Sequence, residues 1–465
     1  MLLRLYLLCL ILTSLFLGVF TPLYFIALPI IYLSFYSRDI PLLAYTSVII
    51  ASVFALAYIF MCTIVLRDPS LGFLFSEFRP SFDSLGDSYQ LSVIFSSLFL
   101  VFLFFFFRVE FFARLRANYF KILKNSRNNA KKLSSNSPLY ALAIVTAIHF
   151  SLTYVRSSSG FGIMGQSSES VGLLTTIYFR YQSHLSPLLM LYLLSIFNPQ
   201  RKIYKSFGWL LVVLALSGGL FTGSKSGLLS PILLFLIYKI NLSMPLNQFL
   251  LPNFSSAIKT IKLRYLIFAL VMLPISVLLT VSGMLLRPYL LETSLSSLSW
   301  LEYIQSRFFE FISNAVIPLL YSFASRINTL LGIQMAITSD LSFDPLSIDL
   351  FNVQNPIWYT QFIANLPGTS DFRSPGFYGL FMMFGPLLAA FFSATKISVV
   401  LGIFYLSAPI FSRIILPFSV YFAYLFLFGF VDGYFPAQDQ LTFYLSCFVL
   451  LIVDRFKWSH LESVH

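Results

Sequence analysis

The residues best suited to chemistry lie in one segment, 287–375, whose cations are all arginine. Arginine presents a rigid fork of N–H donors that pairs with phosphate or carboxylate oxygens, whereas lysine is a point charge. The segment has four arginines, Arg287, Arg307, Arg326 and Arg373, and seven acids, Glu292, Glu302, Glu310, Asp340, Asp344, Asp349 and Asp371. It could therefore hold a phosphorylated or acidic ligand and also supply an acid or base. Solvated loop charges with internal ion pairs are the alternative.

Two polar residues lie inside an apolar segment, at about 172–197, that is predicted to span a membrane. Arg180 and His184 are one helical turn apart and share a face. An arginine at mid-membrane costs about 2.5–3.5 kcal/mol on insertion scales, and such residues usually face the protein interior or a wet cavity. Together the two could contact a pyrophosphate or relay a proton, although a histidine in this position can also be structural.

A small-residue turn around Lys225 is a further candidate anion site. The stretch from Gly218 to Ser226 looks like a phosphate loop, but Ser224 separates Gly223 from Lys225 and no strand precedes it, which excludes nucleotide binding. Exposed backbone N–H groups at a helix N-terminus, with one cation, can still bind an anion. A tight hairpin with a snorkelling lysine is the alternative. Asp432 follows an apolar run and is a candidate functional carboxylate. A solvated side chain at the end of a span is the alternative.

Composition places these residues in a membrane protein. The 465-residue chain is 58% hydrophobic and 10% charged, whereas soluble proteins have about 25% charged residues. Recurring apolar runs predict an all-α polytopic membrane protein with about 12 transmembrane helices and one large outer loop. The net charge of +12 does not indicate nucleic-acid binding, because the basic residues concentrate in a few loops. The scattered cysteines and histidines form no disulfide framework and no metal-ligand spacing.

The chain divides into three predicted regions. Residues 1–286 carry helices one to nine and a basic cytoplasmic connection at 108–136. That connection has eight Lys or Arg against one acid within 108–132, the strongest orientation signal in the sequence. Its aromatic residues suggest an amphipathic helix on an anionic leaflet, and a plain topogenic loop is the alternative. Residues 287–375 are predicted to form the large outer loop, on the side opposite to 108–136, and 376–465 to carry three helices with a cytoplasmic C-terminus.

Some boundaries are predicted in more detail. An outer loop is expected at 67–90, before the fourth span. The tenth span is expected at about 376–394, returning inside at Lys396. The apolar segment 395–413 is interpreted as a re-entrant or interfacial helix, because a full span there would place Arg455 outside, against the charge rule.

Several of these features together resemble a known family. A hairpin of small residues around Lys225, Arg180 entering span six, and a large arginine-bearing loop late in the chain resemble bacterial O-antigen polymerases of the Wzy type. The stretch 373–379, with Phe-Gly-Pro at 384–386, is similar to that family's re-entry after the loop, and 430–433 looks like its short last outer turn. The resemblance covers most of the chain in topology and extends to GT-C-like polymerases and ligases.

The resemblance implies a glycosyltransferase at the periplasmic face of the bacterial inner membrane. Such enzymes move a growing glycan from undecaprenyl pyrophosphate to the sugar of an incoming lipid-linked repeat unit, without metal, nucleotide or other cofactor. The implied partners are the undecaprenyl-pyrophosphate-linked oligosaccharide, the lipid bilayer and a chain-length-regulating co-polymerase, and no nucleic acid. The rivals are an O-antigen ligase, which differs in acceptor, and a flippase. Transporters usually contain internal repeats, and none is evident here.

The same resemblance assigns roles to particular residues. It implies that Arg180, Lys225, Arg307 and Arg326, and also Arg156 and Arg373, hold the pyrophosphate. With the candidates from position in the sequence, we predict that Arg307, Arg326, Glu310 and His184 are catalytic. We predict that the substrate-binding residues are Arg156, Arg180, Lys225, Arg373 and Asp432. Lys225 stands where the family often has arginine, which puts bidentate binding there in doubt. Related ligases place a histidine in the large loop and this chain has none there, so Glu302, Glu310 or Asp344, or else His184, would act as base.

Overall fold

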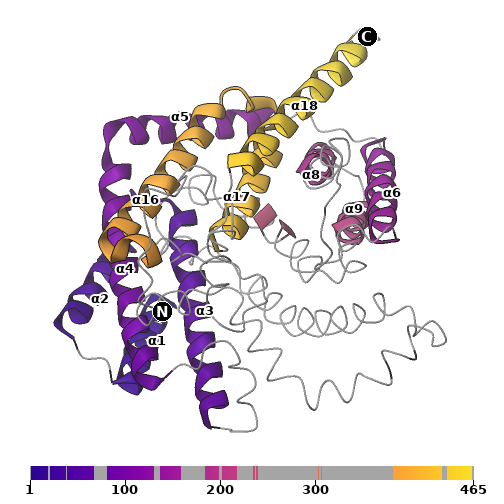
Figure 1. Ribbon diagram of the computed structural model, residues 1–465. Coiled ribbons are helices and arrows are strands. Elements are labelled where there is room, and N and C mark those ends of the chain that lie inside the picture. The colour runs from indigo at the N-terminus through magenta and orange to yellow at the C-terminus, as the bar shows by residue number, and fades with distance from the viewer. Residues whose placement is uncertain are drawn as a thin grey trace.

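The part of the chain that the computed structural model describes consists of helices and turns. The described residues are 2–18, 21–37, 39–67, 81–129, 137–158, 184–197, 202–216, 234–235, 237–238, 302, 305, 381–431 and 437–462. They contain no β-strand, which confirms the all-α prediction for these ranges (Figure 1). Among them, two helices are long and apolar enough to cross a membrane, Phe82–Arg108 and Gly385–Ser407. Shorter apolar helices accompany them.

The first four helices pack together around α4. They are α1 (Leu2–Leu17), α2 (Pro22–Ser34), α3 (Leu42–Arg67) and α4 (Phe82–Arg108). The hydroxyls of Tyr24 on α2 and Tyr89 on α4 each donate to the carbonyl of Leu10 on α1, at 3.0 Å. Both tyrosines are buried. One backbone carbonyl therefore links three helices in an apolar interior.

Helix α4 begins earlier than the sequence analysis predicted. The expected outer loop at 67–90 is wrong over its last part, because α4 starts at Phe82. Ser81 and Ser84 exchange side-chain and backbone hydrogen bonds of 3.0 Å, which form a capping box. Asp83 lies in the first turn, where a carboxylate is favoured by the helix dipole. Polar residues that resemble a loop in sequence thus form the start of a long helix.

The C-terminal region contains α16 (Phe381–Ser407), η6 (Ser412–Ile414), α17 (Ile415–Val431) and α18 (Ala437–Glu462). The predicted break near Lys396, between a span at 376–394 and a separate helix at 395–413, is wrong, because α16 runs through Lys396 without a break. The helix instead bends at Gly385, whose φ of 71° suits a residue without a Cβ and which precedes Pro386. It ends at Ser407, just before Pro409, which cannot continue a helix.

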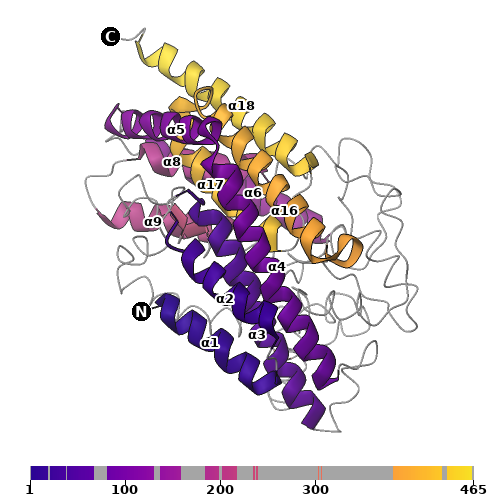
Figure 2. The ribbon, with the colours of Figure 1, turned by 90° about the vertical axis from the view of Figure 1, so that its left-hand side faces the viewer.

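Helices α4 and α16 lie side by side and run in the same direction. Phe391 of α16 contacts Phe102 and Phe106 of α4, and Gly402, further along α16, packs against Phe112 beyond the end of α4. Helix α5 (Glu110–Asn129) follows α4 and lies crosswise at the end where both helices finish (Figures 1 and 2). The C-terminal end of α18 lies at this end of the molecule too.

The remaining helices are α6 (Ser137–Ser158), α8 (Ser186–Ile196) and α9 (Lys202–Leu216). Helix α6 packs against α8 and α9, and α8 also contacts α17 and α18. Eight of the eleven residues of α8 are buried, including Tyr192. An apolar helix that is buried all round belongs to the interior of a bundle, so α8 joins the middle of the chain to its C-terminal helices.

Candidate functional site

The structure places few of the predicted site residues. Among the predicted catalytic residues, His184 is described with its side chain. Among the predicted substrate-binding residues, Arg156 lies near the end of α6, and nothing beyond its place on the helix is described. The other predicted site residues lie outside the described ranges, namely Arg180, Lys225, Arg307, Glu310, Arg326, Arg373 and Asp432. Their proposed roles stay predictions.

His184 lies just before α8 and faces α17. Its side chain is buried, and its Nδ1 lies 3.4 Å from the hydroxyl of Tyr421, a long and therefore weak hydrogen bond. The two rings meet edge to face at 6.2 Å, and Tyr421 stacks on Tyr424. The imidazole therefore shares a weak hydrogen bond with a phenol inside the bundle. In this arrangement it is poorly placed to meet a sugar from outside.

A second histidine, His149, contacts the chain two residues after His184. The sequence analysis did not single it out. His149 of α6 is buried, and its Nδ1 lies 2.9 Å from the hydroxyl of Ser186 in the first turn of α8. Thr153 donates to the His149 carbonyl at 2.8 Å. The signal was present in the sequence, because His149 stands inside an apolar run of membrane length. We call His149, His184, Ser186 and Tyr421 the histidine cluster.

The histidine cluster joins three helices through polar side chains. A serine beside an imidazole at this distance has the geometry of an activated nucleophile. Ser186 is 2% exposed and His149 is 7% exposed, so a sugar substrate has no access to the pair in this structure. Buried polar groups need partners to avoid a large desolvation cost. The cluster is therefore suited to fixing α8 between α6 and α17.

Helix α8 makes another buried polar contact, with α18. Tyr192 donates a hydrogen bond to the Oδ1 of Asp454 on α18. Asp454 is 4% exposed, although it lies in a charged stretch with Arg455 that reads from sequence as a solvated helix end. A buried carboxylate without a donor would be costly, so this contact holds α8 and α18 in register.

Lys396 is the residue whose position differs most from its sequence interpretation. It is the middle residue of the candidate span Gly385–Ser407, about 16 Å along the helix from either end. Its side chain is partly buried, and among the described residues no carboxylate forms an ion pair with it. On α16 it lies beside Val399 and Ile403, which are exposed. Lysines within membrane spans usually line ligand paths or wet cavities, so Lys396 joins the candidate site residues.

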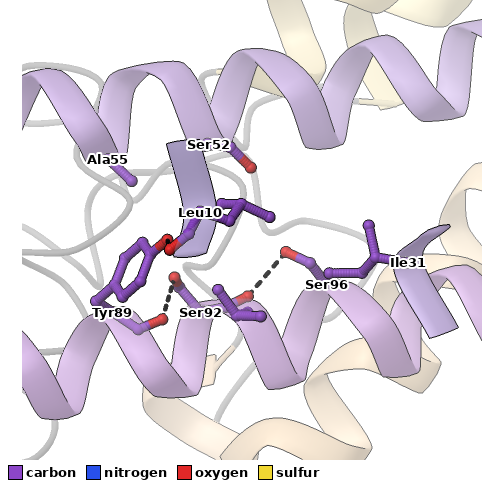
Figure 3. Close-up of a pocket in the computed structure, with 8 residues that line it drawn as sticks. Leu10, Ile31, Ser52, Ala55, Tyr89, Ser92 and Ser96 are labelled. Carbon is purple, nitrogen blue, oxygen red and sulfur yellow. Dashed lines mark hydrogen bonds between the residues drawn. The ribbon is translucent and has the colours of Figure 1, made fainter. Parts of the chain in front are cut away.

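A small cavity lies between the first four helices (Figure 3). It is lined by Leu10, Ile31, Ser52, Ala55, Tyr89, Ser92, Val93 and Ser96, with room for about one water molecule. The hydroxyls at its wall donate to backbone carbonyls, Ser92 to Tyr89 at 2.7 Å and Ser96 to Ser92 at 2.8 Å. A sugar or a pyrophosphate does not fit this space. It is suited to a structural water.

Neither a metal-binding group among the described residues nor a known relative assigns a function to the site. Within the described residues, no group of three or more His, Cys, Asp or Glu side chains could hold a metal ion. The predicted metal independence stays a prediction, because most of the predicted site lies elsewhere in the chain. No family model, curated protein or solved structure matches the chain. The likeness to O-antigen polymerases therefore rests on the sequence features alone.

Proposed function

We propose that the protein is a metal-independent oligosaccharide repeat-unit polymerase of the inner membrane, with about 12 spans. It transfers a glycan from undecaprenyl pyrophosphate to the sugar of an incoming lipid-linked repeat unit at the periplasmic face. The observation that carries the proposal is the arginine-only segment 287–375 with its interspersed carboxylates, in a chain with two helices able to cross a membrane. Arginine forks suit pyrophosphate, and carboxylates suit proton transfer.

The arrangement of α4, α5 and α16 supports the orientation that this function requires. Helix α4 ends at the basic helix α5, which the charge rule places in the cytoplasm. Because α16 runs parallel to α4, its first residues lie toward the opposite side. The segment 287–375 precedes α16 and would then meet the periplasm. Asp39, between α2 and α3, contacts Arg116 of α5, so the connection between α2 and α3 lies at the same end of the bundle as α5.

The proposed chemistry divides the work among few groups. The acceptor hydroxyl oxygen bonds to the anomeric carbon of the donor glycan, and the bond from that carbon to the pyrophosphate oxygen breaks. Arg307 and Arg326 stabilise the charge that grows on the departing undecaprenyl pyrophosphate. The hydroxyl proton passes to a carboxylate such as Glu310. His184 is buried against Tyr421, so we assign it a supporting role, and we assign Lys396 to the path of the lipid-linked substrate.

A deletion strain tests the proposal most directly. Loss of a polymerase leaves a single repeat unit on the lipopolysaccharide core, and complementation with the intact gene restores the ladder. A bare core would instead identify a ligase or a flippase. Those two separate by where the lipid-linked repeat unit accumulates, on the periplasmic face for a ligase and on the cytoplasmic face for a flippase.

A further inference from the structure

The inner face of α5 is held in one orientation by two polar contacts. Tyr119 is fully buried, and its hydroxyl lies 2.7 Å from the hydroxyl of Ser419 on α17. Ser419 itself donates to the Ile415 carbonyl, so Tyr119 is the donor. Burial raises the pKa of the Tyr119 hydroxyl above its usual range, which keeps it a donor. One turn earlier, Arg116 donates to the Asp39 carbonyl at 2.7 Å. The helix therefore cannot roll about its axis without losing buried hydrogen bonds.

The opposite face of α5 is exposed and cationic. Arg114, Lys121 and Lys124 follow one another along it at helical spacing, and all three are exposed, as is Arg108 at the end of α4. The carboxylate on this face, Glu110, pairs with Arg114 at 2.5 Å. Among the described residues, no carboxylate pairs with Arg108, Lys121 or Lys124. The face thus presents uncompensated positive charge.

Helix α5 lies level with the end of the candidate span in α16. Tyr119 packs on the rings of Phe404 and Tyr405, at 5.2 and 5.5 Å, and α16 continues past them to Ser407. Helix α5 therefore lies against the flank of the last turns of α16 instead of beyond its end (Figure 2). At the α4–α5 junction, Val109 and Phe111 are more than half exposed. Apolar side chains beside cations are typical of a helix at the boundary between acyl chains and headgroups.

We propose that α5 is an interfacial anchor that binds the headgroup phosphates of anionic phospholipids through Arg108, Arg114, Lys121 and Lys124. The exposed Val109 and Phe111 insert into the adjacent acyl region. An acidic protein partner would complement the cations, but it would leave these two apolar side chains in water. The anchor would serve a polymerase, a ligase or a flippase alike, so its test is independent of the proposed reaction.

The test measures lipid preference of the full chain. The protein is reconstituted in phosphatidylcholine nanodiscs that contain spin-labelled phosphatidylglycerol or spin-labelled phosphatidylcholine, and the relative association of the two is measured by electron paramagnetic resonance. We expect a preference for phosphatidylglycerol that weakens in about 0.5 M salt. Each of Lys121→Gln and Lys124→Gln should lower it by up to about fivefold. The triple variant with Arg114→Gln should come close to no preference.

Matched variants separate this site from general charge. A triple variant that keeps the three charges, Arg114→Lys with Lys121→Arg and Lys124→Arg, should keep the preference for phosphatidylglycerol. Arg455→Gln removes an exposed cation of α18 and should leave it nearly unchanged. The proposal is overturned if the triple Gln variant keeps the preference, or if Arg455→Gln lowers it as much. It is also overturned if the intact protein binds polyglutamate but shows no preference for phosphatidylglycerol.

Discussion

At the scale of single residues, the proposed chemistry depends on arginines that lysine cannot replace. Arg307→Lys and Arg326→Lys keep the charge but lose the planar fork, so polymer formation should fall about 100- to 1000-fold while the protein still folds. The measurement is the chain-length distribution of surface polysaccharide at matched membrane levels of each variant. Arg67→Ala, at the exposed end of α3, is the control and should be nearly silent. Normal ladders from both lysine variants would show that this segment is not the active site.

Lys396 gives a residue-scale prediction that separates function from folding. If its charge serves the substrate path, Lys396→Met should be at least as stable as the intact protein, because an uncompensated charge at mid-span is costly. Polymer formation should meanwhile fall about 10- to 100-fold, the value of one hydrogen bond to a charged group. Thermal unfolding in detergent and the polysaccharide ladder are the two readouts. A clear loss of stability would instead indicate an ion pair within the chain.

At the scale of elements, the docking of α5 can be measured through one hydroxyl. Tyr119→Phe removes the donor to Ser419 but keeps the ring packing on Phe404 and Tyr405. The free energy of unfolding should fall by about 0.5–1.5 kcal/mol. Tyr140→Phe, on the exposed face of α6, removes a hydroxyl of the same kind and should change little. Equal effects of the two substitutions would argue against a specific contact between α5 and α17.

The elements also show what the sequence could and could not predict. Apolar runs of membrane length predict the helical class, because backbone groups without water must be paired within the helix. The ends of helices are harder to predict, because the same polar residue can lie in a loop, at a helix end or within a helix. Lys396 looks like the end of a span, yet the apolar residues after it continue α16. Asp83 looks like part of a loop, yet the capping box at Ser81 makes it part of the first turn of α4. Contacts such as that of His149 with Ser186 join residues far apart in sequence and leave no local pattern.

At the scale of the whole molecule, orientation in the membrane can be tested with introduced cysteines. Cys9, Cys62 and Cys447 are replaced by serine or alanine first, and single cysteines then replace Lys124, Arg67 and Ser347. Lys124 lies on α5, and Arg67 is the last residue of α3, which ends at the other end of the bundle (Figure 1). Ser347 belongs to the segment 287–375. In cells with a permeable outer membrane, an impermeant thiol reagent should label positions 67 and 347 and spare position 124.

This pattern follows from charge and direction together. The charge rule predicts that α5, and with it the end of α4, lies in the cytoplasm. Because α16 runs parallel to α4, the same rule predicts that α16 begins on the periplasmic side. Arg67 tests α3 independently, because α3 begins near Asp39 and so near α5. Labelling of position 124 with protection of position 347 would show that the protein has the opposite orientation. The arginine segment would then lie on the wrong side of the membrane for the proposed reaction. Labelling of 347 but not of 67 would keep the active-site proposal and contradict the assignment of α3.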